Sequence, residues 1–336
     1  MMQPSISIYI YVFYFTLVPF ALEAEEPIKR GAEFSLEEEF RRQLRKIDRW
    51  TTMQLLRTER DIDKKQKKWA RYSSQPEELA ILAEDEDLGV RFYVASNRHI
   101  TLDLQLLLAQ DPESLVRAGV ALSLKFDPRE GEYEKKLKER IALRLSSDQN
   151  PLVRLVLAQN RFLPDSTYLA LAGDIDPYIR EELAKNIKVP KSALWNLIRD
   201  NDEEVVITAL AHHNLAGEWL EEMSKASSPG VRQAVGLNIN TPITTLEILA
   251  KDSVSVVREA VAQHPRATIE ILEPLAKDAD VGIQILVVKH PNADRELLLQ
   301  MAEANEETVL KTARKRLAPL LKGEIREDIM ERWKPQ

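Results

Sequence analysis

The sequence predicts an all-α protein, a solenoid of about nine helical-pair repeats with capping helices at both ends. Three observations lead to this prediction. Glycine is scarce, at 10 of 336 residues, while 44% of the residues are apolar and 30% are charged, a composition typical of helical proteins. One apolar position recurs with a fixed period along most of the chain. Within each period, the apolar residues have helical spacing in two separate segments.

The period is visible at an apolar residue, here called the marker, which precedes an arginine in most repeats. Successive markers are 26 residues apart, except for one interval of 37 residues that contains an 11-residue insertion near 127–137. The nine repeats, numbered 1 to 9, therefore span residues 76–319. Their markers are Val90, Val116, Val153, Ile179, Val205, Val231, Val257, Ile283 and Val309.

Each repeat is predicted to contain two short helices. A leucine or methionine stands eight residues before every marker, and a valine, leucine or alanine stands four residues after it. Pro164, Pro190 and Pro242 fall where the next first helix begins, a position at which the missing amide hydrogen costs nothing. Because one helix pair is too small to bury a core of its own, the repeats must stack.

The ends of the chain differ from the repeats. Residues 1–24 are apolar and aromatic, lack Lys and Arg, and precede an abruptly polar segment, which predicts a secretory signal peptide cleaved near Ala24. An uncleaved membrane anchor formed by residues 6–22 is the alternative. Either interpretation predicts that the bulk of the chain is exported, to the bacterial periplasm or by secretion, or is anchored facing outward.

Capping segments are predicted on both sides of the repeats. Residues 25–75 should form an N-terminal helical cap, because Ser35 and Glu38 make a capping box and the apolar residues that follow form one stripe. Residues 320–336 should form the matching C-terminal cap. A solenoid needs such caps to cover the apolar faces of its terminal repeats.

Residues 257–280 resemble the variant leucine-rich repeat, and the pattern of an aspartate five residues before Val-Arg resembles the HEAT-repeat signature. The resemblance covers residues 76–319. It implies a right-handed α-solenoid and a protein-binding role. The iron–sulfur cluster found beside such repeats in one setting cannot be carried over, since the chain has no cysteine.

Two charged columns predict contacts between repeats. Aspartate usually stands five residues before the marker, and arginine usually stands one residue after it. The arginine missing at Val206 matches the aspartate missing at Ala226 in the next repeat, and Gln284 matches Ala304 in the same way. Because losing one partner of a half-buried pair costs more than losing both, we infer a structural ladder between successive repeats. Its pairs are Arg91–Asp111, Arg117–Asp148, Arg154–Asp174, Arg180–Asp200, Arg232–Asp252 and Arg258–Asp278.

A third column, seven residues after the marker, holds mostly asparagine and histidine. Asparagine tolerates left-handed backbone and histidine can bond terminal carbonyls, so the column predicts C-terminal ends of the second helices. His264 and His290 lie in successive repeats, about 8–10 Å apart by helix packing, which is too far to share a metal. No metal site and no cofactor are therefore predicted.

The sequence contains no catalytic motif and predicts no enzyme activity. Its net charge of −7 provides no general basic field for nucleic acid. A HEAT-like enzyme acting on nucleic acid would need a basic inner face, so we consider this alternative weaker, and no nucleic-acid partner is predicted.

Binding is predicted on the second helices, whose positions two and six residues after the marker point away from the core. In HEAT-like arrays this surface lines the concave side. Several apolar residues stand there, which suggests contact with another protein or peptide. Two alternatives stay open, namely that neighbouring helices enclose these residues or that the N-terminal segment covers them. The predicted function is a non-catalytic protein–protein interaction scaffold outside the cytoplasm, or a membrane-anchored structural protein if residues 6–22 are retained. The predicted partner-binding residues are Phe92, Leu122, Leu155, Ile207, Leu237 and Ile285.

Overall fold

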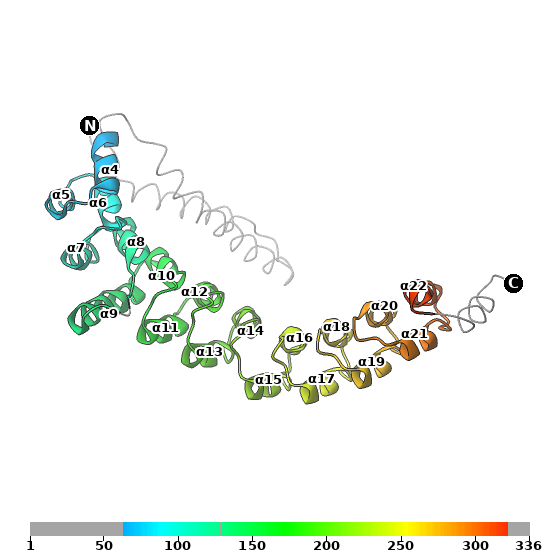
Figure 1. Cartoon of the computed structure of the whole chain (residues 1–336). Helices are drawn as coiled ribbons and strands as arrows, with labels where there is room; N and C mark the ends of the chain where they lie inside the picture. The colour runs from blue at the N-terminus through cyan, green and yellow to red at the C-terminus, as the bar shows by residue number, and fades with distance from the viewer. Residues whose placement is uncertain (1–62, 128, 322–336) are drawn as a thin grey trace, which may run out of the picture. The chain divides into compact units, whose positions relative to one another are not determined.

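The computed structural model describes residues 63–127 and 129–321, and this part of the chain is helical without any strand (Figure 1). The predicted signal peptide, the first part of the predicted N-terminal cap and most of the predicted C-terminal cap lie outside the described residues. Among the helices of the described ranges, none has the length and apolar character that a membrane span requires.

Every repeat consists of two helices. The first helices are α5 (Pro76–Leu82), α7 (Leu102–Leu108), α9 (Glu132–Ser146), α11 (Asp165–Ala172), α13 (Lys191–Leu197), α15 (Gly217–Met223), α17 (Ile243–Leu249), α19 (Ile269–Leu275) and α21 (Arg295–Met301). The second helices are α6 (Leu88–Ala95), α8 (Ser114–Ser123), α10 (Pro151–Ala158), α12 (Pro177–Ala184), α14 (Glu203–Leu210), α16 (Pro229–Leu237), α18 (Ser255–Gln263), α20 (Val281–Lys289) and α22 (Glu307–Leu317). Helix α4 (Asp63–Tyr72) precedes them, and the 3₁₀ helix η1 (Ala318–Leu320) follows them.

The helices of the repeats form two rows, one of first helices and one of second helices (Figure 1). Each second helix packs against the second helix of the next repeat along the whole array. From α13 onward, the first helices of adjoining repeats pack together far less. Because the second helices pack more closely than the first helices do, they lie on the inner side of the curved array of repeats. The prediction of an all-α solenoid of nine helical pairs is confirmed.

One continuous core runs through the repeats. All nine markers are buried, and so are the apolar residues four positions after them. Isolated helices shorter than about 12–15 residues are marginal in water, so these helices depend on packing against their neighbours. Side-chain caps help six of the nine second helices to begin; the Asp176 carboxylate, for example, accepts the Tyr178 amide hydrogen at 3.0 Å.

The insertion predicted near 127–137 lengthens a first helix. Helix α9 has 15 residues, whereas the other first helices have seven or eight. Its C-terminal half supplies the usual core residues Ile141 and Leu145, both buried. The added residues therefore extend the helix and the loop before it, while α8 and α10 still pack directly together.

Helix α4 occupies the place of a second helix before repeat 1. It packs against α6, and the buried Lys67 ammonium pairs with Asp87 at 2.8 Å. The Asn97 amide donates to the carbonyls of Ala70 and Ser73 at 2.7 and 3.0 Å. This part of the predicted cap thus covers the apolar side of repeat 1, as a terminal capping element must.

Gly119 marks the closest approach of two second helices. A Cβ added there would lie 2.9 Å from the Ala95 Cβ, a distance that forces α6 and α8 apart. We expect Gly119→Ala to lower the stability of the protein by about 1–2 kcal/mol, because overpacking outweighs the gain in helix propensity. Gly131→Ala is the control, since nothing lies within 4 Å of the added atom. Equal urea-unfolding midpoints for the two variants would contradict this packing.

Candidate functional site

Six arginines join successive repeats along the elbow edge, which is formed by the segments between the first and second helix of each repeat. Each arginine donates from Nε and Nη2 to the two carboxylate oxygens of one aspartate in the next repeat, with Nε–Oδ2 distances of 2.6–2.7 Å. The six contacts join the same residues as the pairs inferred from the columns: Arg91–Asp111, Arg117–Asp148, Arg154–Asp174, Arg180–Asp200, Arg232–Asp252 and Arg258–Asp278.

Each arginine of this ladder also holds its own elbow. The Arg258 Nη1 donates to the carbonyl of Asp252 at 2.8 Å, while its other nitrogens hold the Asp278 carboxylate. The Asp278 Oδ1 accepts the Asp280 amide hydrogen at 2.9 Å. The hydrogen bond from Arg258 lowers the pKa of Asp278, although burial opposes this effect. One guanidinium therefore fixes two elbows and the distance between them.

The Arg–Asp pair is missing between repeats 5 and 6 and between repeats 8 and 9. Between repeats 5 and 6, an aromatic cluster joins the first helices α13 and α15. The ring centroids of Trp195 and Trp219 lie 4.8 Å apart, and the Arg199 guanidinium lies 3.0 Å from the Trp195 ring centroid. Arg199 also pairs with Glu222 of the next repeat. Between repeats 8 and 9, Gln284 keeps the bond to its own elbow by donating to the Asp278 carbonyl at 2.6 Å.

A second ladder runs along the turn edge, formed by the segments between each second helix and the next first helix. Here the asparagine and histidine column reaches the preceding repeat. The Asn186 amide donates to the carbonyls of Ala158 and Asn160 at 3.0 and 2.8 Å. The His264 Nε2 lies 2.9 Å from the Asn238 carbonyl, and the His290 Nε2 lies 3.0 Å from the His264 carbonyl.

The column stands at the C-terminal ends of the second helices, as predicted, but the expected left-handed backbone and bonding to the helix's own carbonyls are wrong. The backbone at Asn238, His264 and His290 is extended, with φ between −73° and −67°, so no left-handed residue is needed. Each side chain bonds carbonyls of the previous repeat. It also accepts a hydrogen from an amide two residues ahead, as the His264 Nδ1 does from Arg266 at 3.1 Å. A single sequence shows the column but not which carbonyls it reaches.

Histidine replaces asparagine in this ladder because the neutral ring also has one donor and one acceptor. With Nε2 donating to a carbonyl and Nδ1 accepting from an amide, His264 is neutral in the fold. Burial lowers the pKa of His264, and the positive charge of Arg266 adds to this effect. Burial also lowers the pKa of His212. Among the described residues, no group of three or more His, Asp or Glu side chains could hold a metal.

Of the six predicted partner-binding residues, only Leu122 and Leu237 are exposed, at 59% and 52% of their surface. Phe92, Ile207 and Ile285 are half-buried and pack on the core. Leu155 is only 8% exposed, so its prediction as a binding residue is wrong. The second helices lie close together on the inner side of the curve, and this packing encloses the position two residues after the marker, as the open alternative anticipated.

Three exposed apolar residues that the sequence columns did not identify lie on the turn edge, while others, such as Ile81 and Ile248, lie on first helices. Phe162, Ile187 and Ile239 are 55%, 49% and 46% exposed. Leu122 and Leu237 stand in the last turn of α8 and α16, next to the same edge. A helical periodicity does not report the exposure of residues in turns. The signal that could have identified them is a large apolar residue eight or nine positions after the marker.

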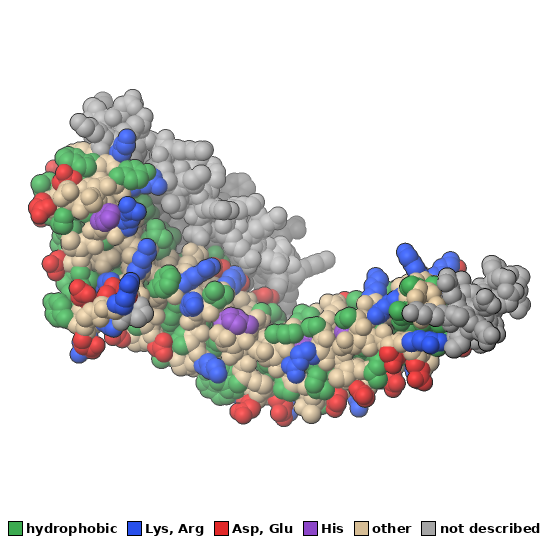
Figure 2. Space-filling view, in the orientation of Figure 1, with side chains coloured by type: hydrophobic (Ala, Val, Ile, Leu, Met, Phe, Trp, Pro, Cys, Tyr) green, Lys and Arg blue, Asp and Glu red, His purple; other side chains and the backbone are tan. Residues whose placement is uncertain are grey.

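The charges of the two edges differ. Elbow segments carry more acidic than basic residues, among them Glu86, Glu113 and Asp202. Turn segments carry mainly cations: Arg98, Lys125, Arg129, Arg161, Lys188 and Arg266. Figure 2 shows hydrophobic and basic side chains on the face toward the viewer, while the acidic side chains along the lower border lie on the side of the first helices. The turn edge is therefore a mixed basic and apolar surface.

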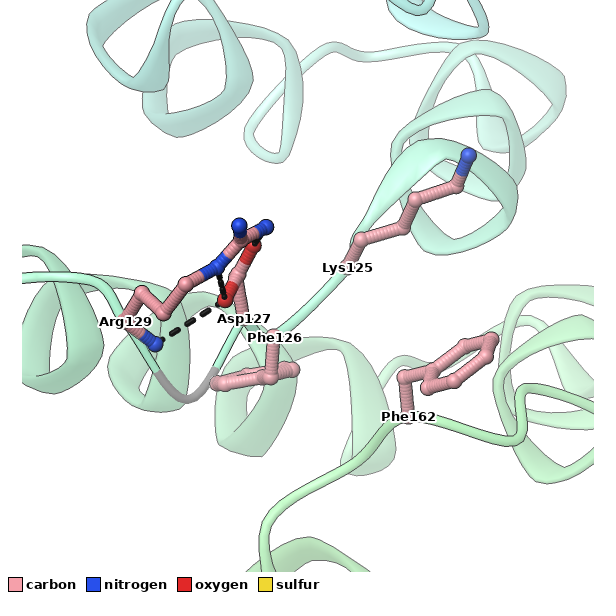
Figure 3. A pocket seen from close by; sticks show the side chains of 5 residues that line it. All are labelled: Lys125, Phe126, Asp127, Arg129 and Phe162. Carbon is pink, nitrogen blue, oxygen red and sulfur yellow. Dashed lines mark hydrogen bonds and ion pairs between the residues drawn. The ribbon is translucent and has the colours of Figure 1, made fainter.

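The long turn of repeat 2 forms a shallow hollow with the turn of repeat 3. Its volume is about 480 Å³, and it is lined by Lys125, Phe126, Asp127, Arg129 and Phe162 (Figure 3). Asp127 and Arg129 pair at 2.7 Å and cancel each other's charge. The Lys125 ammonium has no such partner in the hollow, as the close view shows. The hollow thus offers two aromatic rings and one net positive charge.

Comparisons with known proteins bear on the fold. No protein-family model and no curated protein matches the chain. A solved structure described as a leucine-rich repeat variant with a novel repetitive structural motif is 21% identical, covers 70% of this chain and 88% of its own, and has a TM-score of 0.51. The fold is that of a helical repeat protein. An engineered protein also matches, at 15% identity over 77% of this chain and 95% of its own, with a TM-score of 0.31. These likenesses concern the solenoid fold alone.

The direction of the arginine ladder can be measured with two double-mutant cycles. Arg258→Ala and Asp278→Ala should couple by about 1.5–3 kcal/mol in unfolding free energy, because their guanidinium and carboxylate touch and are mostly buried. Arg258→Ala and Asp252→Ala should couple by less than about 0.5 kcal/mol, since Arg258 contacts the Asp252 carbonyl, which alanine retains. Equal coupling energies would overturn the assignment of the rungs.

Replacing His264 with asparagine, which repeat 6 uses at this position, should keep the ladder and remove one source of acid sensitivity. The folded-state pKa of His264 is below 6.5, so neutral imidazole stabilises the fold above about pH 6.5 and this contribution is lost as the pH falls below that value. The stability difference between wild type and variant should shift between about pH 7.5 and about pH 5.5, by at most about 1.4 kcal/mol per pH unit. Urea unfolding measures it, with His264→Ala as the variant that loses the bond at every pH. A difference independent of pH would contradict the neutral ring.

Proposed function

We propose that the protein is a non-catalytic protein–protein interaction scaffold. The observation that carries this proposal is the set of large apolar side chains left exposed beside the turn edge, on Leu122, Phe162, Ile187, Leu237 and Ile239. Two ladders already fix the repeats at both edges, so these side chains have no evident part in holding the array together. Exposed apolar residues grouped along one edge are typical of surfaces that contact another protein.

The binding surface proposed here differs from the sequence-based proposal in its position. It keeps the inner-face residues Leu122 and Leu237 and extends to the turns, rather than following the half-buried row of Phe92, Ile207 and Ile285. A rigid array that presents the same kind of position once per repeat suits an elongated partner, because each repeat adds one contact.

The proposed location is outside the cytoplasm, supported by the apolar segment of residues 1–24. If residues 6–22 are retained as an anchor, the protein would instead act as a membrane-anchored structural protein. The nucleic-acid enzyme remains the weaker alternative, because the net charge is −7.

Site-specific photocross-linking in the cells that produce the protein tests the scaffold proposal. Benzoylphenylalanine at Leu237 should give a cross-link to a second protein, since this side chain is 52% exposed beside the turn edge. The same group at Ile248, which is 58% exposed on the first helix α17, is the matched control and should give none. Identical products at both positions, or none at Leu237, would contradict the proposed surface.

A further inference from the structure

We propose that the turns of repeats 2, 3 and 4 bind an extended segment of another protein in which each group of three residues holds one acidic and one apolar residue. This inference rests on the proposed scaffold function and names the chemistry of its partner. The surface, here called the turn strip, consists of Lys125, Phe126, Arg161, Phe162, Ile187 and Lys188.

The three turns repeat one combination of side chains. Each offers one cation and one large apolar residue at neighbouring positions: Lys125 with Phe126, Arg161 with Phe162, and Lys188 with Ile187. Phe162 and Ile187 are about half exposed, and Phe126 is half-buried beside the hollow that it shares with Phe162. The turns of repeats 5 and 6 carry apolar residues but no Lys or Arg. The combination is therefore local to one stretch of the turn edge.

Among the described residues, no side-chain partner holds the cations of the turn strip. Lys125, Arg161 and Lys188 are exposed, and none forms a side-chain ion pair or hydrogen bond with another described residue. The two acidic residues within the repeat 2 turn are already paired, Asp127 with Arg129 and Glu130 with Lys138. By contrast, the ladder arginines and Arg266 are engaged with carboxylates or carbonyls. A ligand that supplies carboxylates could form ion pairs with these three cations.

Spacing favours an extended chain. Adjacent packed helices lie about 8–10 Å apart, so equivalent turns recur at about that interval. An extended peptide in the polyproline II conformation advances about 3.1 Å per residue and completes one turn in three residues, so three residues match one repeat and return the chain to the same side. A segment with an acidic residue and an apolar residue in each group of three can place one carboxylate and one apolar side chain on each turn. Three turns then need about nine residues.

Apolar contacts distinguish this ligand from a nucleic-acid strand. Phosphate contacts alone need only cations, and they fall steeply with salt. In the turn strip, each cation lies next to an apolar residue in the sequence. One of these apolar residues, Ile187, is aliphatic and therefore unsuited to base stacking.

Fluorescence anisotropy with the full chain and a labelled nonapeptide of three Glu-Phe-Ser units tests the inference. Wild type should bind this peptide at least tenfold more tightly than a Lys-Phe-Ser nonapeptide, a Glu-Ser-Ser nonapeptide or a ten-nucleotide thymidine strand. Equal or tighter binding of any of these three probes would overturn the proposal, and so would the absence of Glu-Phe-Ser binding at about 1 mM peptide.

Charge-reversal variants locate the binding. Arg161→Glu combined with Lys188→Glu should weaken peptide binding at least tenfold. Lys251→Glu combined with Lys277→Glu changes the net charge equally at two exposed cations of the elbow edge, and should alter binding less than twofold. An equal loss in both double variants would overturn the turn strip. Because the peptide comparison uses wild type alone, a variant that fails to fold does not decide the outcome.

The inference and the scaffold proposal fail separately. If the peptide does not bind but benzoylphenylalanine at Leu237 still gives its cross-link, the scaffold stands and the acidic segment is wrong. If the peptide binds at the turn strip but no cross-link forms at Leu237, the recognition chemistry stands and the proposed extent of the scaffold surface is wrong.

Discussion

The contact between neighbouring repeats is the constraint on which the rest of the structure depends. A pair of helices of mostly seven to eleven residues cannot bury a core alone, so each repeat gains its stability from the next one. Apolar packing supplies most of that stability but tolerates small rotations of one repeat relative to the next. The Arg258–Asp278 pair and its counterparts add direction, because both oxygens of one carboxylate and one carbonyl hold a single planar guanidinium.

Two ladders on opposite edges have a consequence for function. The elbow edge is fixed by arginine and aspartate, and the turn edge by asparagine and histidine bonding to backbone carbonyls. The ladder side chains at both edges thereby find their partners within the fold, apart from the His212 Nδ1. Arg161, Phe162, Ile187 and Lys188 are exposed on the turns and contribute to neither ladder, which is why the proposed recognition surface includes them.

The periodic part of the fold could be predicted from the sequence, because the nine copies of the 26-residue repeat can be aligned with one another. The paired losses at Val206 and Ala226 even indicated which charges meet. Prediction did less well where the answer depends on distances between repeats. Leu155 has the spacing of an outward-facing residue, but the neighbouring second helix is close enough to bury it. Phe162 and Ile187 lie in turns, where no periodic helical pattern reports exposure.

Native-state hydrogen exchange of the elbow amides tests most directly whether the charged ladder orders the array. The amides of Asp202 and Val254 donate to the ladder residues Asp200 and Asp252 at 2.8 and 2.9 Å, whereas the elbow between them has alanine at position 226. The Ser228 amide should therefore exchange faster than those of Asp202 and Val254, although it lies in the middle of the array. Protection of Ser228 equal to that of its two neighbours would contradict the account.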